Sequence, residues 1–271
     1  MTERIWMIHV VARVQDCDAE VYVNDIPVAR LLQHESAAVS LPVHPQLVQG
    51  DNHVRLLINP GPTPAEATRA GAGTPIARDA SAQLRLMAVP VGQQPAEDDR
   101  GLITKVTFSA QQGRPTTAPA TASATARLPV DLGPRQWQHG QRFDAITPEL
   151  RDSALAFLNQ VRNALQAGQA RKLASLWQTK ISETALAYGL QPNTQLKEFV
   201  GEWEAAARTP GFQLAPVTAA QASLRLVADG RVVDCVGKDW EPLIRMADMS
   251  AGGMLLGLGI ARIGGQWTVV L

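Results

Sequence analysis

Short stretches of alternating apolar and polar residues fill the first half of the chain. In residues 5–14, from Trp6 to Val14, every second side chain is apolar, and His9 and Arg13 lie on the opposite side. This two-residue period predicts a half-buried strand with Trp6 on the core face. The further strands of this kind are predicted at residues 19–24, 37–43, 54–58, 83–89, 102–108 and 124–130. Short, closely spaced strands separated by turn residues predict an antiparallel β-sandwich or barrel.

The period changes to that of an α-helix between residues 147 and 209. Thr147-Pro148-Glu149 supplies an N-cap hydroxyl, a proline at the first helical position and an acid at the positive end of the dipole. A second helix is expected over residues 169–188, and a third begins after Asn193 or Thr194 as its cap. Each helix carries an apolar stripe, which needs a sheet to cover.

Alternation returns after the third helix, at residues 212–217 and 223–227. Asp229-Gly230 and Gly264-Gly265 are two-residue hairpin signals that join the strands of a curved antiparallel sheet. The sequence therefore predicts an α+β chain, in which three helices precede this sheet. That order resembles the nuclear-transport-factor-2-like roll, and a cystatin-like or unrelated α+β arrangement stays open.

The predicted domains follow from these patterns and from two segments that interrupt them. Residues 59–80 are rich in proline, glycine and alanine and predict a long surface loop, as do residues 111–125. A β-sandwich domain is expected over residues 1–133, a bridge over 134–146 and an α+β roll over 147–271. The stretch Leu47-Val48-Gln49-Gly50-Asp51-Asn52-His53-Val54 resembles the turn into a strand found in jelly-roll, galactose-binding-like sandwiches. Glycine permits positive φ there and asparagine caps the turn, so the likeness implies a fold.

Charge and composition narrow the functional classes. The 25 Lys and Arg residues balance 25 Asp and Glu residues, and no basic run occurs, which disfavours a nucleic acid or an anionic membrane as partner. No apolar run approaches the roughly 20 residues of a membrane span, and residues 1–6 alternate without a signal pattern, so we expect a cytoplasmic protein. Cys17 and Cys235 form neither a disulfide framework nor a CxxC motif.

The candidate metal and cofactor motifs all lack the required spacing. His34, His44 and His53 recur at near-regular intervals but without the spacing of zinc sites, so surface or turn histidines are expected. The acidic run at 97–99 lacks the alternation of a calcium loop and predicts a solvated turn. The glycines within 257–259 are followed by a strand signal and do not make a dinucleotide site. No metal and no cofactor is expected.

A catalytic alternative rests on the roll-like half. All five histidines lie at or before His139, which leaves Tyr188, Asp234 and Asp239 as a possible acid/base set in a cone-shaped cavity. Against it, Tyr188 continues a helical core stripe and both aspartates lie at strand ends or turns. The prediction is therefore a protein without a catalytic site. The alternative is a nuclear-transport-factor-2-like protein that uses the cone-shaped cavity, either as a lyase- or isomerase-like enzyme or to bind a small molecule.

Three segments resemble bacterial immunity-type proteins, which are encoded beside toxins of contact-dependent or type VI secretion systems. They are residues 21–28 (VYVNDIPV), 157–165 (FLNQVRNAL) and 183–189 (ETALAYG). The resemblance implies a cytoplasmic binding protein that neutralises a cognate toxin by occluding its active site. Six tryptophans and the lack of a catalytic constellation fit such an interaction scaffold.

The partner surface is expected near the end of the second helix and the loop after the first hairpin. Glu183, Asp239 and Trp240 are the candidate contact residues. Glu183 could instead pair with Lys180 at i, i+3, and Trp240 could simply close the core. A third reading, a carbohydrate-binding module, follows from the sandwich likeness alone. It needs exposed aromatic side chains, for which the first domain offers Trp6, Tyr22 and Phe108.

Overall fold

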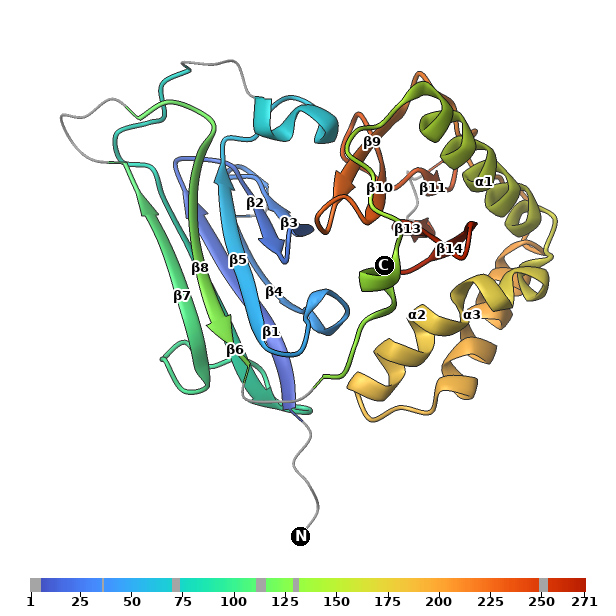
Figure 1. Cartoon of the computed structure of the whole chain (residues 1–271), viewed down its shortest axis with the longest axis horizontal. Coiled ribbons are helices and arrows are strands. Elements are labelled where there is room, and N and C mark those ends of the chain that lie inside the picture. The colour runs from blue at the N-terminus through green and yellow to red at the C-terminus, as the bar shows by residue number, and fades with distance from the viewer. Residues whose placement is uncertain (1–5, 36, 70–73, 111–115, 129–131, 249–252) are drawn as a thin grey trace, which may run out of the picture. The chain divides into compact units, whose positions relative to one another are not determined.

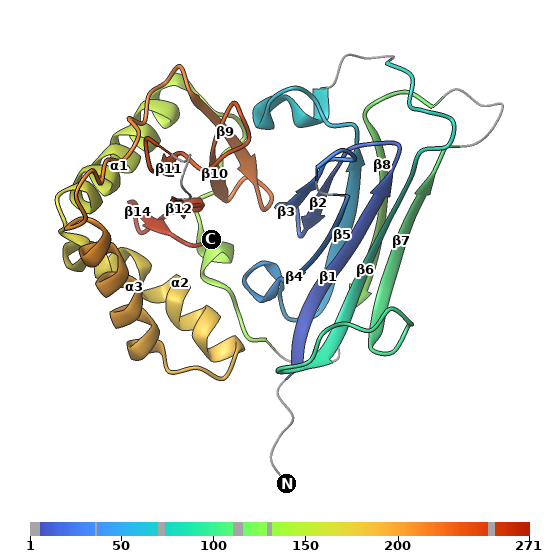
Figure 2. The same cartoon turned by 180° about the vertical axis from the view of Figure 1, so that it is seen from behind.

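The computed structural model describes residues 6–35, 37–69, 74–110, 116–128, 132–248 and 253–271. The chain divides into two compact units, residues 1–135 (unit 1) and 136–271 (unit 2). Antiparallel sheets come first, followed by three helices and a further antiparallel sheet (Figures 1 and 2). The predicted α+β class is therefore confirmed. None of the described helices is long and apolar enough to cross a membrane.

Unit 1 contains two four-stranded antiparallel sheets. The first sheet has the order β4-β1-β6-β7 and the second the order β3-β2-β5-β8. The elements are β1 (Trp6–Gln15), β2 (Ala19–Val23), β3 (Ile26–Leu31), β4 (Ala38–Pro42), η1 (His44–Gln46), β5 (Asp51–Ile58), η2 (Pro64–Arg69), β6 (Ser81–Pro90), β7 (Leu102–Ser109) and β8 (Ala120–Arg127).

The two sheets of unit 1 share one hydrophobic core. Ile8 and Val10 of β1 belong to it together with Val21 of β2 and Leu56 of β5, and each of the four is fully buried. The predicted alternation is thus correct for β1 with two exceptions, since His9 on the other face is also buried and Trp6 is exposed. Trp6 is 36% exposed, because it pairs with Pro90 at the extreme ends of β1 and β6, where the core no longer covers it.

The turn before β5 has the conformation that its sequence predicts. Gly50 has a φ of +91°, and the fully buried Asn52 side chain closes the turn. Its Oδ1 accepts from the Val48 N–H at 2.9 Å, and its Nδ2 donates to the carbonyls of Val48 at 2.9 Å and Gly50 at 3.0 Å. Asn24 Nδ2 also donates to Asn52 Oδ1 at 2.7 Å, which ties this turn to the β2–β3 hairpin.

The segments predicted as long loops differ in part from the structure. β8 begins at Ala120, inside the predicted loop 111–125, and pairs with β5 over its whole length. Its run of Ala, Thr and Ser has little apolar–polar contrast, so alternation revealed only its second half, which lies in the predicted strand 124–130. Within 59–80, residues 64–69 form η2. Some parts of the predicted elements lie outside the described residues. They are Ile5, residues 70–73, residues 111–115 and Val130.

Unit 2 consists of three helices and a four-stranded sheet of order β14-β13-β10-β9, with a separate β11-β12 pair (Figure 1). The elements are η3 (Gln136–His139), α1 (Pro148–Gln166), η4 (Ala170–Leu173), α2 (Ala174–Ala187), α3 (Pro192–Ala206), β9 (Ala222–Val227), β10 (Val232–Gly237), β11 (Ile244–Arg245), β12 (Leu255–Leu256), β13 (Leu258–Ile263) and β14 (Gln266–Val269). The predicted second helix is split into η4 and α2, and residues 212–217 form only an isolated bridge from Leu214 to Met246.

The predicted start of α1 is confirmed, and that of α3 is wrong. Thr147 Oγ1 accepts from the Leu150 N–H at 3.2 Å, with Pro148 at the first helical position. In α3 the N-cap is Gln191 and not Asn193 or Thr194. Pro192 decides this, because its fixed φ and missing donor suit the first helical position.

Replacing Thr147 by alanine is expected to lower the stability of unit 2 by about 1 kcal/mol, because the Leu150 N–H loses its acceptor. Urea unfolding, monitored by tryptophan fluorescence, reports on unit 2, because five of the six tryptophans lie there and only Trp6 lies in unit 1. Thr194→Ala is the matched control, and we expect it to change stability by less than about 0.5 kcal/mol. Equal losses in the two variants would contradict the assignment of the cap.

The helices pack on one face of the unit 2 sheet. Trp177 of α2 belongs to the same buried cluster as Val233 and Cys235 of β10. Because neighbouring residues of a strand point to opposite faces, Asp234 lies on the other face of the sheet. The β9–β10 hairpin turns at Asp229 and Gly230, with φ values of +55° and +76°, as their sequence predicts.

Candidate functional site

The face of the first sheet that points away from the core carries a row of polar side chains. Val10 and Ala12 belong to the core, so Val11 and Arg13 point to the opposite face. Cross-strand pairing brings Gln83 of β6 beside Arg13 and Ser40 of β4 beside Val11. Residues from three strands therefore share this face.

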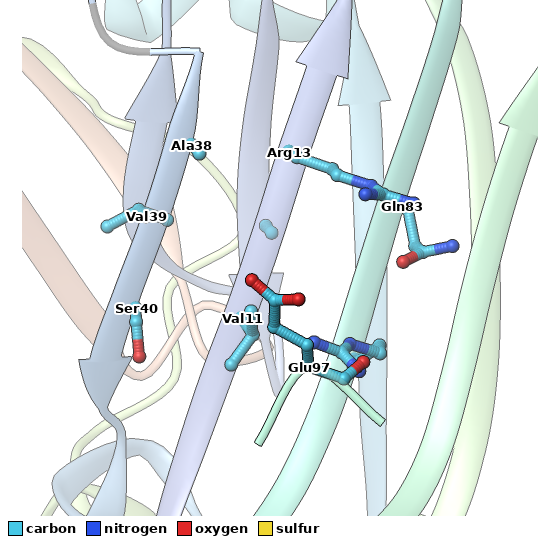
Figure 3. Close-up of a pocket in the computed structure, with 9 residues that line it drawn as sticks. Val11, Arg13, Ala38, Val39, Ser40, Gln83 and Glu97 are labelled. Carbon is cyan, nitrogen blue, oxygen red and sulfur yellow. The ribbon is translucent and has the colours of Figure 1, made fainter. Parts of the chain in front are cut away.

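Two adjoining hollows open on this face. The first has a volume of about 500 Å³, and its lining includes Val11, Arg13, Ser40, Gln83, Arg85 and Glu97 (Figure 3). The second, of about 370 Å³, again includes Arg13 and Gln83 and extends to Thr107 of β7. We call the two hollows together the trough. In Figure 3 the Arg13 side chain extends from β1 toward Gln83.

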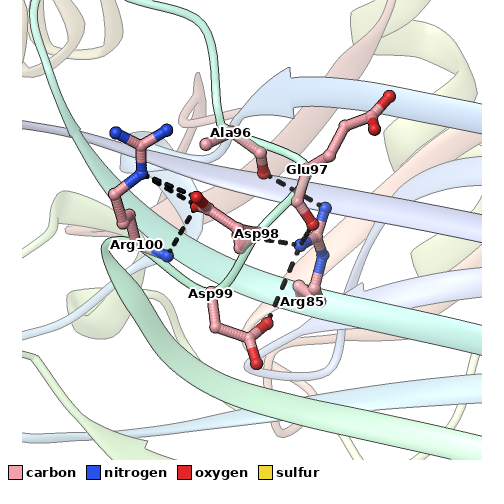
Figure 4. Close-up of polar contacts among 6 residues, drawn as sticks. All are labelled: Arg85, Ala96, Glu97, Asp98, Asp99 and Arg100. Carbon is pink, nitrogen blue, oxygen red and sulfur yellow. Dashed lines mark hydrogen bonds and ion pairs between the residues drawn. The ribbon is translucent and has the colours of Figure 1, made fainter.

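Arg85 fixes the loop that carries Glu97 at the trough. Its Nη1 donates to the carbonyls of Glu97 at 2.7 Å and Asp98 at 3.2 Å (Figure 4). Asp99 Oδ1 lies 3.9 Å from the same nitrogen. Within the loop, the backbone N–H of Arg100 lowers the pKa of the Asp98 carboxyl, helped by the Arg100 side chain, which donates to Asp98 Oδ2 at 2.8 Å. The acidic run is thus an exposed turn, as predicted, whose backbone is held by one arginine.

Three side chains of the trough make no hydrogen bond or ion pair within the described part of the chain. They are the guanidinium of Arg13, the amide of Gln83 and the carboxylate of Glu97. Arg13 and Glu97 are exposed and Gln83 is half-buried. The trough therefore presents donors and acceptors of both charges, while its other arginine, Arg85, is engaged with the loop.

In unit 2, two of the candidate partner-binding residues lie in one turn after β10. The Trp240 N–H donates to the Gly237 carbonyl at 3.0 Å, and Trp240 has a φ of +70°. Asp239 Oδ2 accepts from Arg245 at 2.6 Å, and this hydrogen bond is the main cause that lowers the pKa of Asp239. Asp239 Oδ1 accepts from the Glu241 N–H at 3.2 Å.

Arg225 connects this turn to Asp234. Its Nε lies 2.7 Å from Asp234 Oδ2, and its guanidinium carbon lies 5.6 Å from the centre of the Trp240 ring, within the range of a cation–π contact. We call Arg225, Asp234, Asp239, Trp240 and Arg245 the turn cluster. The sequence could have revealed its Arg225–Asp234 pair, because the Asp229-Gly230 hairpin sets these two residues opposite each other.

The remaining two candidates lie elsewhere in unit 2. Glu183 Oε1 accepts from the Gln136 N–H at 2.8 Å. Burial lowers the pKa of Lys180 to about 8. Tyr188 follows α2, and its N–H contacts the carbonyls of Thr184 and Ala185. The three hollows described here, including one of about 480 Å³ beside the start of α1, are lined by other residues.

The histidines that suggested a metal site do not converge. No group of three His, Cys, Asp or Glu residues among the described residues could hold a metal ion. His34 and His53 are exposed, whereas His44 lies in η1 and is only 1% exposed. Its Nε2 accepts from the Ile8 N–H at 3.2 Å. Of the expected surface or turn positions, His44 thus has the second, as a buried residue of the short helix η1 that bonds to β1.

Two polar side chains of unit 1, those of His9 and Tyr22, are buried. His9, on the non-core face of β1, is only 6% exposed, and burial lowers its pKa. Tyr22 donates to Glu20 Oε2 at 2.5 Å, and the Arg55 guanidinium lies 4.0 Å from the Tyr22 ring centre. No sequence signal indicated these contacts beyond the shared strand face of Glu20 and Tyr22.

The geometry can be compared with known proteins. No family model, no curated protein and no solved structure matches this chain.

Proposed function

We propose that the chain is a non-catalytic binding protein of the immunity type, which neutralises a cognate bacterial toxin in the cytoplasm by occluding it. The resemblance of residues 21–28, 157–165 and 183–189 to such proteins supports the class. The turn cluster supports the mode of action, since it joins an aromatic side chain with two carboxylates and two guanidinium groups.

The conformation of Trp240 is the observation that carries this proposal. A bulky residue at φ +70° is strained, which costs of the order of 1–3 kcal/mol, and such strain concentrates at functional sites. The N–H of Trp240 and the carboxylate of Asp239 are both held within the turn. Tryptophan and charged residues fixed in this way are typical anchors of protein interfaces, because little conformational freedom is lost on binding.

The catalytic alternative has less support from the same residues. Asp239 accepts a hydrogen bond from Arg245 and its pKa is lowered, which makes it a weak base. Asp234 pairs with Arg225 and lies on the sheet face opposite the helices. A cone-shaped cavity between helices and sheet would need it on the other face. A solvent-connected cavity that contains Tyr188 and a carboxylate would favour the enzyme reading.

The finer fold assignments belong to the same proposal. For unit 1 we propose a jelly-roll-like sandwich, supported by the way the chain crosses repeatedly between the two sheets, with only β2–β3 and β6–β7 as consecutive strands of one sheet. For unit 2 we propose a nuclear-transport-factor-2-like roll, supported by three helices followed by an antiparallel sheet whose strands pair in chain order.

Substitution of Trp240 or Asp239 is expected to lower the affinity for the toxin by at least about tenfold. The chain is co-expressed with the product of an adjacent toxin gene, and cell survival and the affinity of the purified proteins are measured. Trp240→Asn removes the ring and tolerates the left-handed backbone, and Asp239→Ala removes the carboxylate. Lys238→Ala, an exposed neighbour in the same turn, serves as the control.

Two results would count against this proposal. One is that the chain protects cells from no adjacent gene product. The other is that Trp240→Asn and Asp239→Ala bind the toxin as well as Lys238→Ala does, which would move the interface away from the turn cluster.

The carbohydrate-binding alternative finds no exposed aromatic platform in the trough. Phe108 lines the second hollow but is half-buried, and Tyr22 is engaged with Glu20 and Arg55. Binding of the chain to glycans on an array, lost on exchange of a trough residue, would favour this alternative.

A further inference from the structure

We propose that the trough of unit 1 binds an extended peptide segment that places an acidic side chain on Arg13 and a basic side chain on Glu97. This surface consists of unit 1 residues only. It is distinct from the turn cluster, and the inference does not depend on the proposed toxin-neutralising function.

The charges of the trough determine the chemistry of its ligand. Arg13 and Glu97 have opposite charges, and neither has a partner among the described residues. A guanidinium binds a carboxylate through two parallel hydrogen bonds, and a carboxylate binds an ammonium or guanidinium group in the same charge-assisted way. A ligand with both charges satisfies the two groups together, whereas a simple anion or cation satisfies one and leaves the other.

The shape of the trough favours an extended chain over a small molecule. Its two hollows, of about 500 and 370 Å³, meet at Arg13 and Gln83 and cross four neighbouring strands. Sites for small ligands usually enclose most of the ligand, whereas this surface is an open depression on a sheet. A polypeptide strand lying on it would meet the Gln83 amide and the Ser40 hydroxyl, which can bond backbone groups, and the apolar side chain of Val11.

The Glu97 side of the trough is fixed before a ligand arrives. Arg85 donates to the carbonyls of Ala96, Glu97 and Asp98, at 3.4, 2.7 and 3.2 Å. These bonds hold the backbone of the loop against the strand face from which Arg85 projects (Figure 4). A fixed loop loses less conformational entropy on binding. Substitution of Arg85 should therefore weaken binding of the ligand, although Arg85 need not touch the ligand.

The test uses synthetic peptides as probes. Fluorescent twelve-residue peptides of Thr, Val and Ser carry one Glu and one Lys at three different separations, in both orders, and matched peptides carry Gln at both positions. Binding to the full chain is measured by fluorescence anisotropy at low and high salt. We expect at least one charged peptide to bind about tenfold more tightly than its Gln counterpart and to weaken as salt is raised.

Variants of the full chain assign the two charges. Arg13→Gln and Glu97→Gln are each expected to abolish the preference for the charged peptide. Lys105→Gln, at an exposed position of β7 on the same face, should leave it unchanged. The double variant with Arg13→Glu and Glu97→Arg should prefer the peptide with Glu and Lys in the reverse order, a gain that a misfolded protein cannot show.

Several outcomes would overturn the inference. These are equal binding of charged and Gln peptides, loss of binding in Lys105→Gln as well, or a double variant with unchanged preference. Competition by free glutamate or lysine at the peptide's own concentration would identify a small zwitterion site and not a peptide groove.

Discussion

Replacing Asn52 by alanine is expected to destabilise unit 1 by about 2–4 kcal/mol. The Asn52 side chain is fully buried and bonds Val48 through both its N–H and its carbonyl. It also bonds the Gly50 carbonyl and accepts from Asn24. Alanine would take this partner away from groups that are partly buried, and a buried polar group that loses its bond costs up to about 1–3 kcal/mol. Relaxation of the turn and entry of water recover part of this loss.

Hydrogen exchange of the β2 and β5 amides measures this effect. Tryptophan fluorescence reports chiefly on unit 2, since Trp6 is the only tryptophan in unit 1, and a two-unit chain need not unfold in one step. Asp51→Ala is the control, because Asp51 is the exposed neighbour of Asn52 in the same strand. Similar protection of the β5 amides in both variants would show that the Asn52 network is not what stabilises the turn.

The turn at Asn52 also shows how far local sequence predicts this fold. Glycine followed two residues later by asparagine predicts the positive φ of Gly50 and a capping side chain, and both are present. The bond from Asn24 to Asn52 joins this turn to the β2–β3 hairpin, and no local pattern predicts it. Period and turn chemistry are local properties and could be read from the sequence, whereas the pairing of distant turns depends on the packed sheets.

The two candidate sites also differ in whether local sequence predicts them. The pair of Arg225 and Asp234 follows from a two-residue hairpin, whose register is set by its turn. Arg13 and Glu97 line the same hollow only because β1 pairs with β6 and the β6–β7 loop folds back onto Arg85. Read alone, Arg13 is one polar position of an alternating strand and Glu97 one member of an acidic run. The trough therefore could not be predicted from the sequence.

Unit 1 is expected to lose about 3 kcal/mol of stability as the pH falls from 7.5 to 4, with His44 as the main cause. The pKa of His44 is lowered from 6.5 to about 4, first by burial and then by the charges of Arg135 and His9. Its Nε2 accepts from the Ile8 N–H, which requires a neutral ring with the proton on Nδ1. A protonated ring would lose this bond and place a charge beside Arg135.

The direction of the effect follows from proton linkage. The unfolded chain takes up a proton at His44 below about pH 6.5, while the folded chain resists until about pH 4. The stabilisation by neutral His44 is therefore complete above pH 6.5 and decreases through this window. Below about pH 4 both states are protonated and the contribution no longer changes. A difference of about 2.5 pH units corresponds to about 3 kcal/mol, and the lowered pKa of buried His9 adds in the same direction.

Hydrogen exchange of the β1 amides at pH 7.5, 6 and 4.5, corrected for the intrinsic exchange rate, measures this loss. His44→Gln separates His44 from other acid-sensitive groups, because a glutamine Oε1 can accept from the Ile8 N–H without titrating in this range. We expect this variant to show a clearly weaker dependence on pH, with His9 as the residual cause. Substitution of the exposed His34 by glutamine should leave the dependence of stability on pH unchanged. If His44→Gln shows the full loss, the acid sensitivity arises elsewhere, and the bond from Ile8 to His44 fixes η1 without acting as its pH-sensitive element.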